Sequence, residues 1–593
     1  LAQLMAQQLQ AMNQLFSQQL QLLTGGAAPA AAAPPAQAPQ AAAPQSALQS
    51  PAPQASAPQT SALQTPAPQA AAAGGSAPQP PSAAPAAASA TASVSAPAAP
   101  RRRTFDPLEP VQVDLGSGLE ERQQRYLERF TAAYARRTAR SKQLAAEHRR
   151  TLADNRWTKD FRSAWKEMIY PIQGNRGLGS RVWDVDGNEY VDIAMGFGLH
   201  LFGHSPEFLV RALREQLDTS LAVGPQSPVA GEAAQLLTRL TGLDRAIFVN
   251  SGTEAVMAAL RAARTWSGRD RIGRFNGAYH GWSDATLVRG LEVGGKRRTL
   301  PGAPGVPAAA VENTVVFDWA TPEGLAALEE EIDTLGAVIV EPVQSRRPDL
   351  QPREFLHEVR RITRQAGVPL ILDEMVTGFR IHPRGAQGWF DVDADLAIYG
   401  KVLAGGLPLG ALAGRAELMD VLDGGAWEFG DASYPAAQKT LVVGAYFKNP
   451  LTIAAVRATL RELEARGPAM QEELNARTGR LIARLSELFG EQRAPLEAIH
   501  CGSLFRLETT DSHETNQLFF FHLVQEGVFY TRETGNCFLS TAHTDADVDR
   551  IVGAVERSVA AMQEGGFFPP GPPGRRAPAR VEAPPPAAVA TAA

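Results

Sequence analysis

The sequence predicts an α/β protein with a mostly parallel central β-sheet, helices on both faces of that sheet, and a second, smaller α+β domain. The evidence is a repeated alternation of short apolar runs with helical segments. Residues 246–250 precede a helix expected at 253–266, and residues 337–343 precede a helix expected at 354–366. Apolar runs this short, bounded by turn residues, are typical of strands buried on both faces.

The most informative stretch runs from Pro369 to Gly410. It contains two apolar runs, 369–372 and 396–399, and each ends on a charged residue at a turn. The first run is followed by Asp373, and the second, one residue further on, by Lys401. Ligands of open α/β sheets bind beyond the carboxyl ends of the strands. We therefore expect this acid and this lysine to act on one small molecule.

The other elements of the globular part follow in chain order. Residues 182–194 alternate apolar and polar side chains around Asp186-Gly187-Asn188, which predicts a β-hairpin. A helix is expected at 229–241, and from about Asn449 the pattern changes to long helices with a few strands. These patterns predict the following segments: an N-terminal part of the small domain at 156–225, a large ligand-binding domain at 226–445, a C-terminal part of the small domain at 446–563, and a Pro/Ala-rich linker at 564–593.

The N-terminal part of the chain has a different composition. Residues 1–24 carry apolar side chains at spacings of three and four, which predicts an amphipathic docking helix, or a helix without a partner. Residues 25–103 are almost entirely Ala, Pro, Gln and Ser and predict a disordered linker. Residues 104–155 predict an Arg-rich helical extension, and such a charge pattern most often marks a solvated face.

Composition excludes several classes of function. The net charge of −5 over 593 residues gives no reason to expect nucleic acid as a partner. With two cysteines, the chain has neither a disulfide framework nor a Cys-based zinc site, so we expect no metal and a cytoplasmic location. No apolar run is long enough to span a membrane, and no secretory signal is visible. The first residue is Leu, so we expect a piece of a longer polypeptide.

Polar groups also follow three other predicted strands. Residues 250–254, Asn-Ser-Gly-Thr-Glu, stand where a strand gives way to a helix. Their Ser-x-x-Glu spacing is that of a capping box, yet the free N–H groups of a helix start, with two hydroxyls, also form a phosphate cradle. Tyr279-His280-Gly281 and Glu341-Pro342 follow the other two strands. An aromatic ring there either packs or stacks on a flat cofactor.

One cofactor would use all of these groups. Pyridoxal phosphate needs a phosphate cradle, a lysine amine for a Schiff base and an anion beside its pyridine nitrogen. At this point the chain resembles the class III (fold type I) pyridoxal-phosphate aminotransferases, nearest the glutamate-1-semialdehyde aminomutase branch. The resemblance spans about residues 161–562 and is carried by WDVDGNEYVD, GFGLHLFGH, FVNSGTEAVMAALRAAR, NGAYHG, EPVQ, LILDEMVTGFR, GKVLAGGLPLGALAGR and QEGVFY.

The resemblance implies a role for each matching residue. Lys401 would bind the cofactor covalently and pass protons, with pyridoxamine phosphate as the intermediate form, and Asp373 would hold the pyridine nitrogen protonated. The other implied cofactor contacts are Ser251, Gly252 and Thr253 at the phosphate, Tyr279 against the ring with His280 beside it, and Glu341 and Val376 in the pocket wall. Arg162 stands where the aminomutase branch has an arginine for a substrate carboxylate.

Two positions depart from the family pattern. The threonine that in the family reaches the phosphate across the dimer interface is replaced by Ala445, so the affinity for the cofactor is expected to be weaker or another group to substitute. In ornithine-type relatives a late arginine binds the donor carboxylate, but here no arginine follows until Arg550. A substrate whose carboxyl group is tied up as a thioester would not need that arginine.

The flanking segments suggest a context for the enzyme. Their order resembles aminotransferase domains embedded in modular polyketide and nonribosomal peptide synthases. The resemblance implies a homodimer that transfers an amino group from an amino acid donor to a β-ketoacyl thioester on an acyl carrier protein, beside neighbouring synthase domains. The alternatives are a free-standing aminotransferase or aminomutase acting on a small amino aldehyde or ketone, and a catalytically silent dimerising scaffold.

Overall fold

The computed structural model describes residues 118–154, 161–293, 296–511, 513–532 and 534–571. The predicted docking helix at 1–24 and linker at 25–103 lie outside the described residues, as does most of the predicted C-terminal linker at 564–593. No helix in the described residues is both long enough and apolar enough to cross a membrane.

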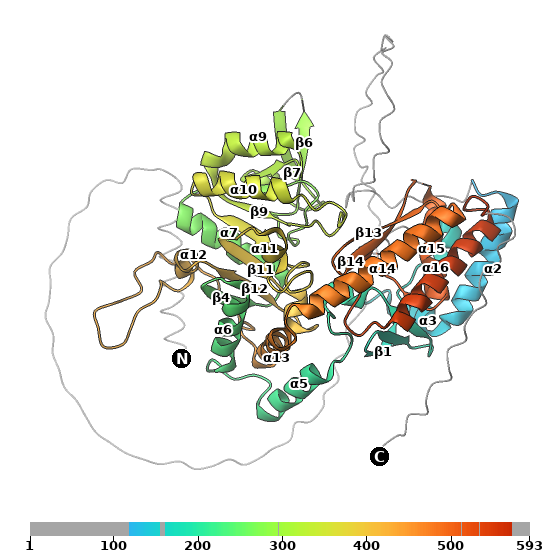
Figure 1. The fold of residues 1–593 in the computed structure, drawn as a ribbon, viewed down its shortest axis with the longest axis horizontal. Coiled ribbons are helices and arrows are strands. Elements are labelled where there is room, and N and C mark those ends of the chain that lie inside the picture. Colours follow the sequence, from blue (N-terminus) through green and yellow to red (C-terminus); the bar gives the residue numbers. More distant parts are fainter. Residues whose placement is uncertain (1–117, 155–160, 294–295, 512, 533, 572–593) are drawn as a thin grey trace, which may run out of the picture. The chain divides into compact units, whose positions relative to one another are not determined.

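The large domain is built on a mixed sheet that contains, in the described part of the chain, seven strands (Figure 1). Strand β12 is antiparallel to both of its neighbours, and the other pairings in the sheet are parallel. The prediction of a mostly parallel sheet is therefore confirmed. In spatial order the strands are β4 (Arg245–Val249), β12 (Gly410–Gly414), β11 (Leu396–Tyr399), β10 (Leu370–Asp373), β9 (Leu335–Val340), β5 (Arg271–Phe275) and β8 (Thr314–Phe317).

Helices cover both faces of this sheet. Alternate residues of β10 enter two separate hydrophobic clusters, because successive side chains of a strand point to opposite faces. Ile371 packs in the cluster that includes α7, whereas Leu370 and Leu372 pack in the cluster that includes α10. Burial on both faces explains why strands such as β9 and β11 are continuous apolar runs. The principal helices of this domain are α6 (Val229–Thr241), α7 (Gly252–Ser267), α9 (Pro322–Glu331) and α10 (Arg353–Gln365).

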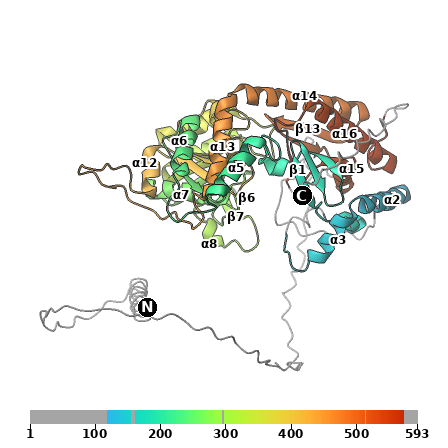
Figure 2. The same ribbon diagram turned by 90° about the horizontal axis from the view of Figure 1, so that it is seen from below.

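Shorter elements complete the large domain. They comprise a hairpin, β6 (Val288–Val293) and β7 (Lys296–Pro301), and the short helices α8 (Ala308–Val311), η3 (Ile332–Thr334), α11 (Gly385–Phe390), η4 (Lys401–Ala404), α12 (Ala416–Met419) and η5 (Asp420–Leu422). Helix α13 (Pro450–Arg466) packs against η4, α6 and α5 (Glu207–Thr219), and α5 lies beside α13 in both Figure 1 and Figure 2.

The small domain combines residues from both ends of the globular part. One sheet pairs β1 (Gly174–Leu178), β2 (Arg181–Asp184), β3 (Glu189–Asp192) and the late strand β15 (Val528–Phe529). The predicted hairpin at 182–194 is confirmed as the antiparallel pair β2–β3, with Gly187 at a φ of +83° in its turn. The other elements are the sheet of β13 (Leu496–Cys501), β14 (Leu504–Thr509) and β16 (Asn536–Phe538), and the helices α4 (Met195–Gly198), α14 (Ala469–Gln492), α15 (Leu518–Gln525), α16 (Asp545–Gly565), η2 (Ser163–Met168) and η6 (Glu514–Gln517).

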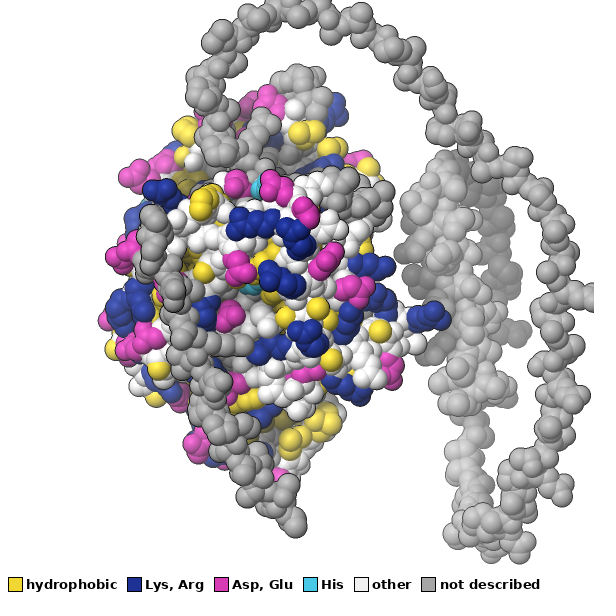
Figure 3. Space-filling model, turned by 90° about the vertical axis from the view of Figure 1, so that its right-hand side faces the viewer, with side chains coloured by type: hydrophobic (Ala, Val, Ile, Leu, Met, Phe, Trp, Pro, Cys, Tyr) yellow, Lys and Arg dark blue, Asp and Glu magenta, His cyan; other side chains and the backbone are white. Residues whose placement is uncertain are grey.

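Two helices precede this domain, α2 (Glu121–Arg137) and α3 (Ala139–His148). The apolar face of α2 is buried against the small domain: the Phe130 ring stacks on His522 at a centroid distance of 3.8 Å. Arg122 adds hydrogen bonds to the carbonyl oxygens of Gln563 and Glu564 at the end of α16. The charge-rich sequence is therefore amphipathic, with its other side exposed. Figure 3 shows the side of the molecule that lies at the right in Figure 1. Lys and Arg side chains are spread over that side, with Asp and Glu among them.

A loop at 423–449 leaves the large domain after η5 and contains no helix or strand among its described residues. It projects beyond α12 in Figure 1 and in Figure 2. The side chains of Phe429 and Tyr446 are 92% and 76% exposed, and Trp427, Tyr434, Leu441 and Val443 are also exposed. An apolar loop of this kind is typical of a surface that another chain covers.

Candidate active site

The residues singled out in the sequence lie at one edge of the central sheet. Asp373 is the last residue of β10, Glu341 directly follows β9, and Lys401 follows β11 by two residues. These three strands are parallel neighbours, so their carboxyl ends lie side by side. Ser251 follows β4, and Tyr279 follows β5. The sheet thus positions the acids, the lysine, the aromatic ring and a helix start around one site.

Asp373 is paired with His280. Its Oδ2 lies 2.8 Å from His280 Nδ1, and both side chains are buried. Its Oδ1 accepts a hydrogen bond from the backbone N–H of Met375 at 3.1 Å. The other ring nitrogen of His280, Nε2, is also buried and has no hydrogen-bond partner among the described residues. The pair thus holds a buried carboxylate in a fixed orientation and leaves one imidazole nitrogen for a further partner.

Glu341 fixes the neighbouring loops. Its two carboxylate oxygens accept hydrogen bonds from the backbone N–H groups of Tyr279, at 3.0 Å, and of Ser345, at 2.9 Å. Burial raises the pKa of Glu341, and the nearby charge of Asp373 raises it further. Glu341 therefore ties the loop after β5 to the loop after β9, which sets the position of the half-exposed Tyr279 ring.

Lys401 begins η4 with a φ of +40°, in the left-handed region that is uncommon for a residue with a side chain. Burial lowers its pKa from 10.5 to about 8, although Glu341 and Asp373 act in the opposite direction. Its amine has no hydrogen bond or ion pair with the described residues. With such a pKa, about one amine in ten is neutral at pH 7, and the neutral amine is the nucleophilic form. Lys401 is thus prepared to attack a carbonyl carbon.

The helix start at α7 acts as a cap and also exposes donors. Ser251 Oγ accepts the backbone N–H of Glu254 at 3.2 Å, while the Glu254 carboxylate accepts the N–H of Asn250 at 2.7 Å. The capping interpretation is therefore confirmed for the serine. The N–H groups of Gly252 and Thr253 have no acceptor within the helix, because the first turn of a helix leaves its donors unsatisfied. These donors and the helix dipole favour an anion there.

Glycines let the loops approach this helix start closely. A Cβ on Gly281, whose φ is +80°, would lie 2.5 Å from Thr253 Oγ1. A Cβ on Gly252 would lie 2.6 Å from the Met375 side chain, and one on Gly410 would lie 2.1 Å from the carbonyl oxygen of Ser251. At Gly281 and Gly410 the close neighbours include backbone atoms of Thr253 and Ser251, so the cradle around α7 requires glycine there, whereas at Gly252 the flexible Met375 side chain would have to move.

The remaining predicted residues have different surroundings. Val376 is buried in a small apolar cluster with Met195, Leu504 and Phe538. Arg162, expected to bind a substrate carboxylate, forms a two-bonded ion pair with Glu514, with Nε–Oε2 at 2.9 Å and Nη2–Oε1 at 2.8 Å. Ala445 is exposed in the loop at 423–449.

Two buried arginines, Arg274 and Arg380, were not predicted from the sequence. Arg274, at the end of β5, donates to the carbonyl oxygens of Phe275, Ala278 and Thr286, and so organises the loop that carries Tyr279 and His280. Arg380 lies in the loop after Asp373 and is fully buried. The signal that could have revealed them was a charged residue inside an apolar strand or within an apolar motif, where burial requires a specific partner.

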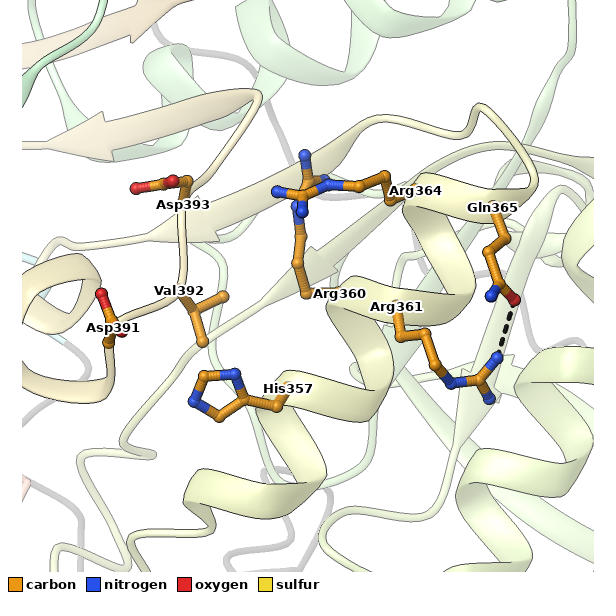
Figure 4. Close-up of a pocket in the computed structure, with 8 residues that line it drawn as sticks. All are labelled: His357, Arg360, Arg361, Arg364, Gln365, Asp391, Val392 and Asp393. Atoms are coloured by element: carbon orange, nitrogen blue, oxygen red, sulfur yellow. Dashed lines mark hydrogen bonds between the residues drawn. The ribbon is translucent and has the colours of Figure 1, made fainter.

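A surface pocket of about 420 Å³ lies elsewhere, between α10 and residues 391–393 (Figure 4). Three arginines line it, but Arg360 is bound by Asp395, and Arg361 donates to Glu358 and Gln365. None of the predicted site residues lines this pocket. Among the described residues no group of three or more His, Cys, Asp or Glu side chains is placed to hold a metal ion.

Comparison with known proteins agrees with this geometry. The family Aminotransferase class-III matches residues 162–557. The glutamate-1-semialdehyde 2,1-aminomutase of Archaeoglobus fulgidus is 35% identical over 404 residues, which cover 66% of this chain and 93% of that protein. The corresponding protein of Chloroflexus aggregans is 35% identical over 414 residues, 66% of this chain and 91% of that protein.

Solved structures give the same result. An omega-transaminase from Sphaerobacter thermophilus superposes with a TM-score of 0.63 at 29% identity, covering 72% of this chain and 98% of that one. A β-phenylalanine aminotransferase from Variovorax paradoxus superposes with a TM-score of 0.64 at 25% identity, covering 76% of this chain and 100% of that one. A transaminase with bound pyridoxal phosphate, 28% identical, has a TM-score of 0.64 and covers 72% of this chain and 99% of that one.

The residues present fit pyridoxal phosphate. The unsatisfied donors at the start of α7 suit its phosphate, the glycines around them leave the space that Cβ atoms would fill, and the orphaned Nε2 of His280 adds a polar group at the buried Asp373. Lys401 supplies an amine of lowered pKa. The chain therefore has the fold of the type I pyridoxal-phosphate enzymes, depends on pyridoxal phosphate, and belongs to the class III aminotransferases.

Proposed function

We propose that Lys401 is the residue that binds pyridoxal phosphate covalently and that Asp373 is the acid beside the pyridine nitrogen. The observation that carries this proposal is their placement at the carboxyl ends of neighbouring parallel strands: Asp373 ends β10, opposite Ile398 of β11, and Lys401 follows β11. Ser251, Gly252 and Thr253 are proposed to hold the phosphate, and Tyr279 to lie against the ring. His280, Glu341 and Val376 complete the proposed cofactor contacts.

Pyridoxal phosphate, when bound, withdraws electrons from the carbon that bears the amino group and so makes the proton on that carbon removable. The protein supplies the remaining functions. Once the amino donor had displaced it from the cofactor, the free Lys401 Nζ would take the proton from the α-carbon of the donor and later return a proton to the acceptor, a role that its pKa of about 8 suits near neutral pH. Asp373 provides a buried negative charge, oriented in advance by His280 and Met375 N–H, that stabilises positive charge on the ring.

Two substrate classes have support. The named relatives, which are glutamate-1-semialdehyde aminomutases, favour a small amino aldehyde or ketone as the substrate of this chain. The second candidate is a β-ketoacyl thioester on an acyl carrier protein, aminated by an amino acid donor within a polyketide or nonribosomal peptide synthase.

Two observations favour the carrier-bound candidate specifically. Arg162 is already neutralised by Glu514, so an incoming free carboxylate would have to displace an internal one. In addition, helices α2 and α3 lie outside the family match at 162–557 yet contact the small domain, α2 through Phe130 and α3 through backbone N–H groups that donate to Asp186, so the chain has an ordered extension that the family model does not include.

A second copy of the chain is proposed to cover the loop at 423–449. The exposed aromatic side chains of this loop need a partner, and Ala445 lies among them. Light scattering of the purified protein tests the expected homodimer, and replacing Phe429 and Tyr446 together by Ser should shift it toward monomers.

The residue assignment is tested by borohydride reduction. Borohydride should fix the cofactor on the peptide that contains Lys401, as read by mass spectrometry, and Lys401→Ala should abolish both this mass increase and the exchange of amino groups. Lys448→Ala is the matched control, because Lys448 is an exposed lysine with a φ of +58°. A chain that takes up no cofactor would favour the scaffold alternative.

The substrate class is tested by competition. A carrier-bound β-ketoacyl chain and small free amino ketones are each incubated with a panel of amino acid donors, and the products are weighed by mass spectrometry. A mass change on the carrier supports the synthase context; turnover of free ketones alone supports the small-molecule candidate. Glu514→Gln should lower the KM for substrates with a free carboxylate, because it releases Arg162.

A further inference from the structure

Arg380 is a charged side chain in a place that normally excludes charge. It lies seven residues after Asp373, and its side chain has no exposed surface. No carboxylate lies within ion-pair distance of it among the described residues, and its Nε has no hydrogen-bond partner there. A buried charge without a counterion is costly. The free-energy cost of burying this guanidinium indicates that Arg380 has a function besides packing.

The hydrogen bonds of Arg380 indicate that function. Within the described residues it donates to the carbonyl oxygen of Gly198 at 2.7 Å, to Ser503 Oγ at 3.1 Å and to the carbonyl oxygen of Leu539 at 3.2 Å. Its guanidinium also lies 4.8 Å from the centre of the Phe538 ring. These acceptors belong to the turn at α4, the turn between β13 and β14, and the end of β16. Arg380 thus joins separate segments of the small domain to the loop that begins at Asp373.

One of those segments is strained. Consecutive residues Met195, Gly196, Phe197 and Gly198 have φ values of 44°, 60°, 61° and 95°. Side chains with a Cβ disfavour this region, so such a turn persists only where its surroundings hold it. Arg380 holds its last carbonyl, and Met195 packs against Val376 from the loop after Asp373. The turn at 195–198 and the loop after Asp373 therefore hold each other in place.

Arg380 also acts on Lys401 through its charge. The charged groups that act on the lysine amine are Glu341 after β9, Asp373 at the end of β10 and Arg380; the two acids favour the protonated amine and Arg380 opposes it. Helix α13 packs against η4, but its Arg457 and Arg461 are paired with Glu232 on α6.

We propose that Arg380 is a positioning residue for the lysine site: it locks the α4 turn, the β13–β14 turn and the end of β16 onto the Asp373 loop, and it places a permanent positive charge within electrostatic range of Lys401. The lock fixes the wall of the site, and the charge adds to burial, which is the larger effect, in disfavouring the protonated amine. This inference rests on the proposed role of Lys401 as the cofactor lysine.

Two variants separate the lock from the charge. Arg380→Met removes both. Arg380→Lys keeps the positive charge, but a lysine ammonium cannot donate to all three acceptors as the planar guanidinium does. Arg353→Met is the matched control, because Arg353 also donates to two carbonyl oxygens, those of Trp389 and Phe390, and lies over an aromatic ring, but on α10 and outside the groups that act on Lys401.

The first readout is the pH dependence of Lys401 acetylation in the cofactor-free protein, followed by mass spectrometry. Arg380→Met should raise the apparent pKa of Lys401 and so lower its labelling rate at pH 7, because a positive charge that opposes the protonated amine is lost. Arg380→Lys and Arg353→Met should leave the pH profile unchanged. In the cofactor-loaded protein, the pH midpoint of the change in visible absorbance should likewise shift in Arg380→Met and stay unchanged in Arg380→Lys and Arg353→Met.

The second readout is hydrogen exchange. Both Arg380 variants should expose the amides around 195–198 and 539 to faster exchange, and Arg353→Met should not. An unchanged labelling profile in Arg380→Met overturns the charge effect, and unchanged exchange in Arg380→Lys overturns the lock. If Arg380→Met does not fold, the test rests on Arg380→Lys. Hydrogen exchange at 195–198 and 539 that is as slow in Arg380→Lys as in the unaltered chain would refute the proposal. Failure of the cofactor assignment itself would appear separately, as no borohydride-fixed cofactor in the unaltered chain.

Discussion

Replacing Lys401 by Met should stabilise the cofactor-free protein at neutral pH. Folding lowers the pKa of Lys401 from 10.5 to about 8, so at pH 7 the folded state holds a charge that its surroundings disfavour. At 1.36 kcal/mol per pKa unit, the difference of about 2.5 units costs somewhat more than about 3 kcal/mol. Part of the side chain is accessible to solvent, so we expect a gain of about 2 kcal/mol on replacement. The lysine is thus kept at the expense of stability.

The sign of the pH dependence makes this prediction specific. Between pH 8 and 10.5 the unfolded chain binds more protons at this lysine than the folded chain does, so the stability of the unaltered protein rises with pH in that window. The advantage of Lys401→Met should therefore be largest at pH 7 and shrink toward pH 10.

Urea unfolding of the cofactor-free proteins, at one fixed protein concentration, measures the difference at pH 7 and at pH 10. Lys448→Met is the control, because Lys448 shares the positive φ but is exposed. An equal or lower stability of Lys401→Met at pH 7, or a gain that does not depend on pH, would refute the assignment of a desolvated amine to Lys401.

Three further changes test other parts of the structure. Asp373→Asn should slow amino exchange by about 10²–10³-fold, because the buried negative charge is lost; single-turnover absorbance measures it, and an unaltered rate would contradict the role of the carboxylate. Gly281→Ala should weaken the binding of pyridoxal phosphate, since the new Cβ would lie 2.5 Å from Thr253 Oγ1 at a φ of +80°; cofactor titration measures the affinity, which would stay constant if this loop did not shape the cradle. Phe130→Ala should destabilise the packing of α2 by about 3–5 kcal/mol, because its buried ring stacks on His522; hydrogen exchange at 121–137 reports the loss, and retained protection would show that the stacking contributes little.

Local patterns were sufficient to predict the strands that position the site. Strands β4, β9, β10 and β11 each contain a short apolar run, and a parallel sheet places the carboxyl ends of neighbouring strands together. Asp373 and Lys401 could therefore be paired before any coordinates were known. The capping serine at 251 was likewise readable, because a cap depends on residues that are only three apart.

The order of strands was beyond local patterns. Strand β12 lies between β4 and β11 and runs antiparallel to both, so the strand that leads to Ser251 and the strand that leads to Lys401 are not neighbours. The periodicity of a strand does not predict its pairing partner, because pairing depends on contacts between residues that are far apart in the chain.

The sequence by itself predicted the fold class and the dependence on pyridoxal phosphate, both of which are confirmed, and it led to the proposal of Asp373 and Lys401 as the acid and the amine. It could do so because strand ends, glycine turns and a lysine after an apolar run are local features. Tertiary structure alone decided how these groups behave. It buried Lys401 deeply enough to lower its pKa, set His280 against Asp373, neutralised Arg162 with Glu514, and joined Arg380 to Leu539 across 159 residues of chain. Burial and long-range pairing are properties of the folded assembly of elements, and no short stretch of sequence contains them.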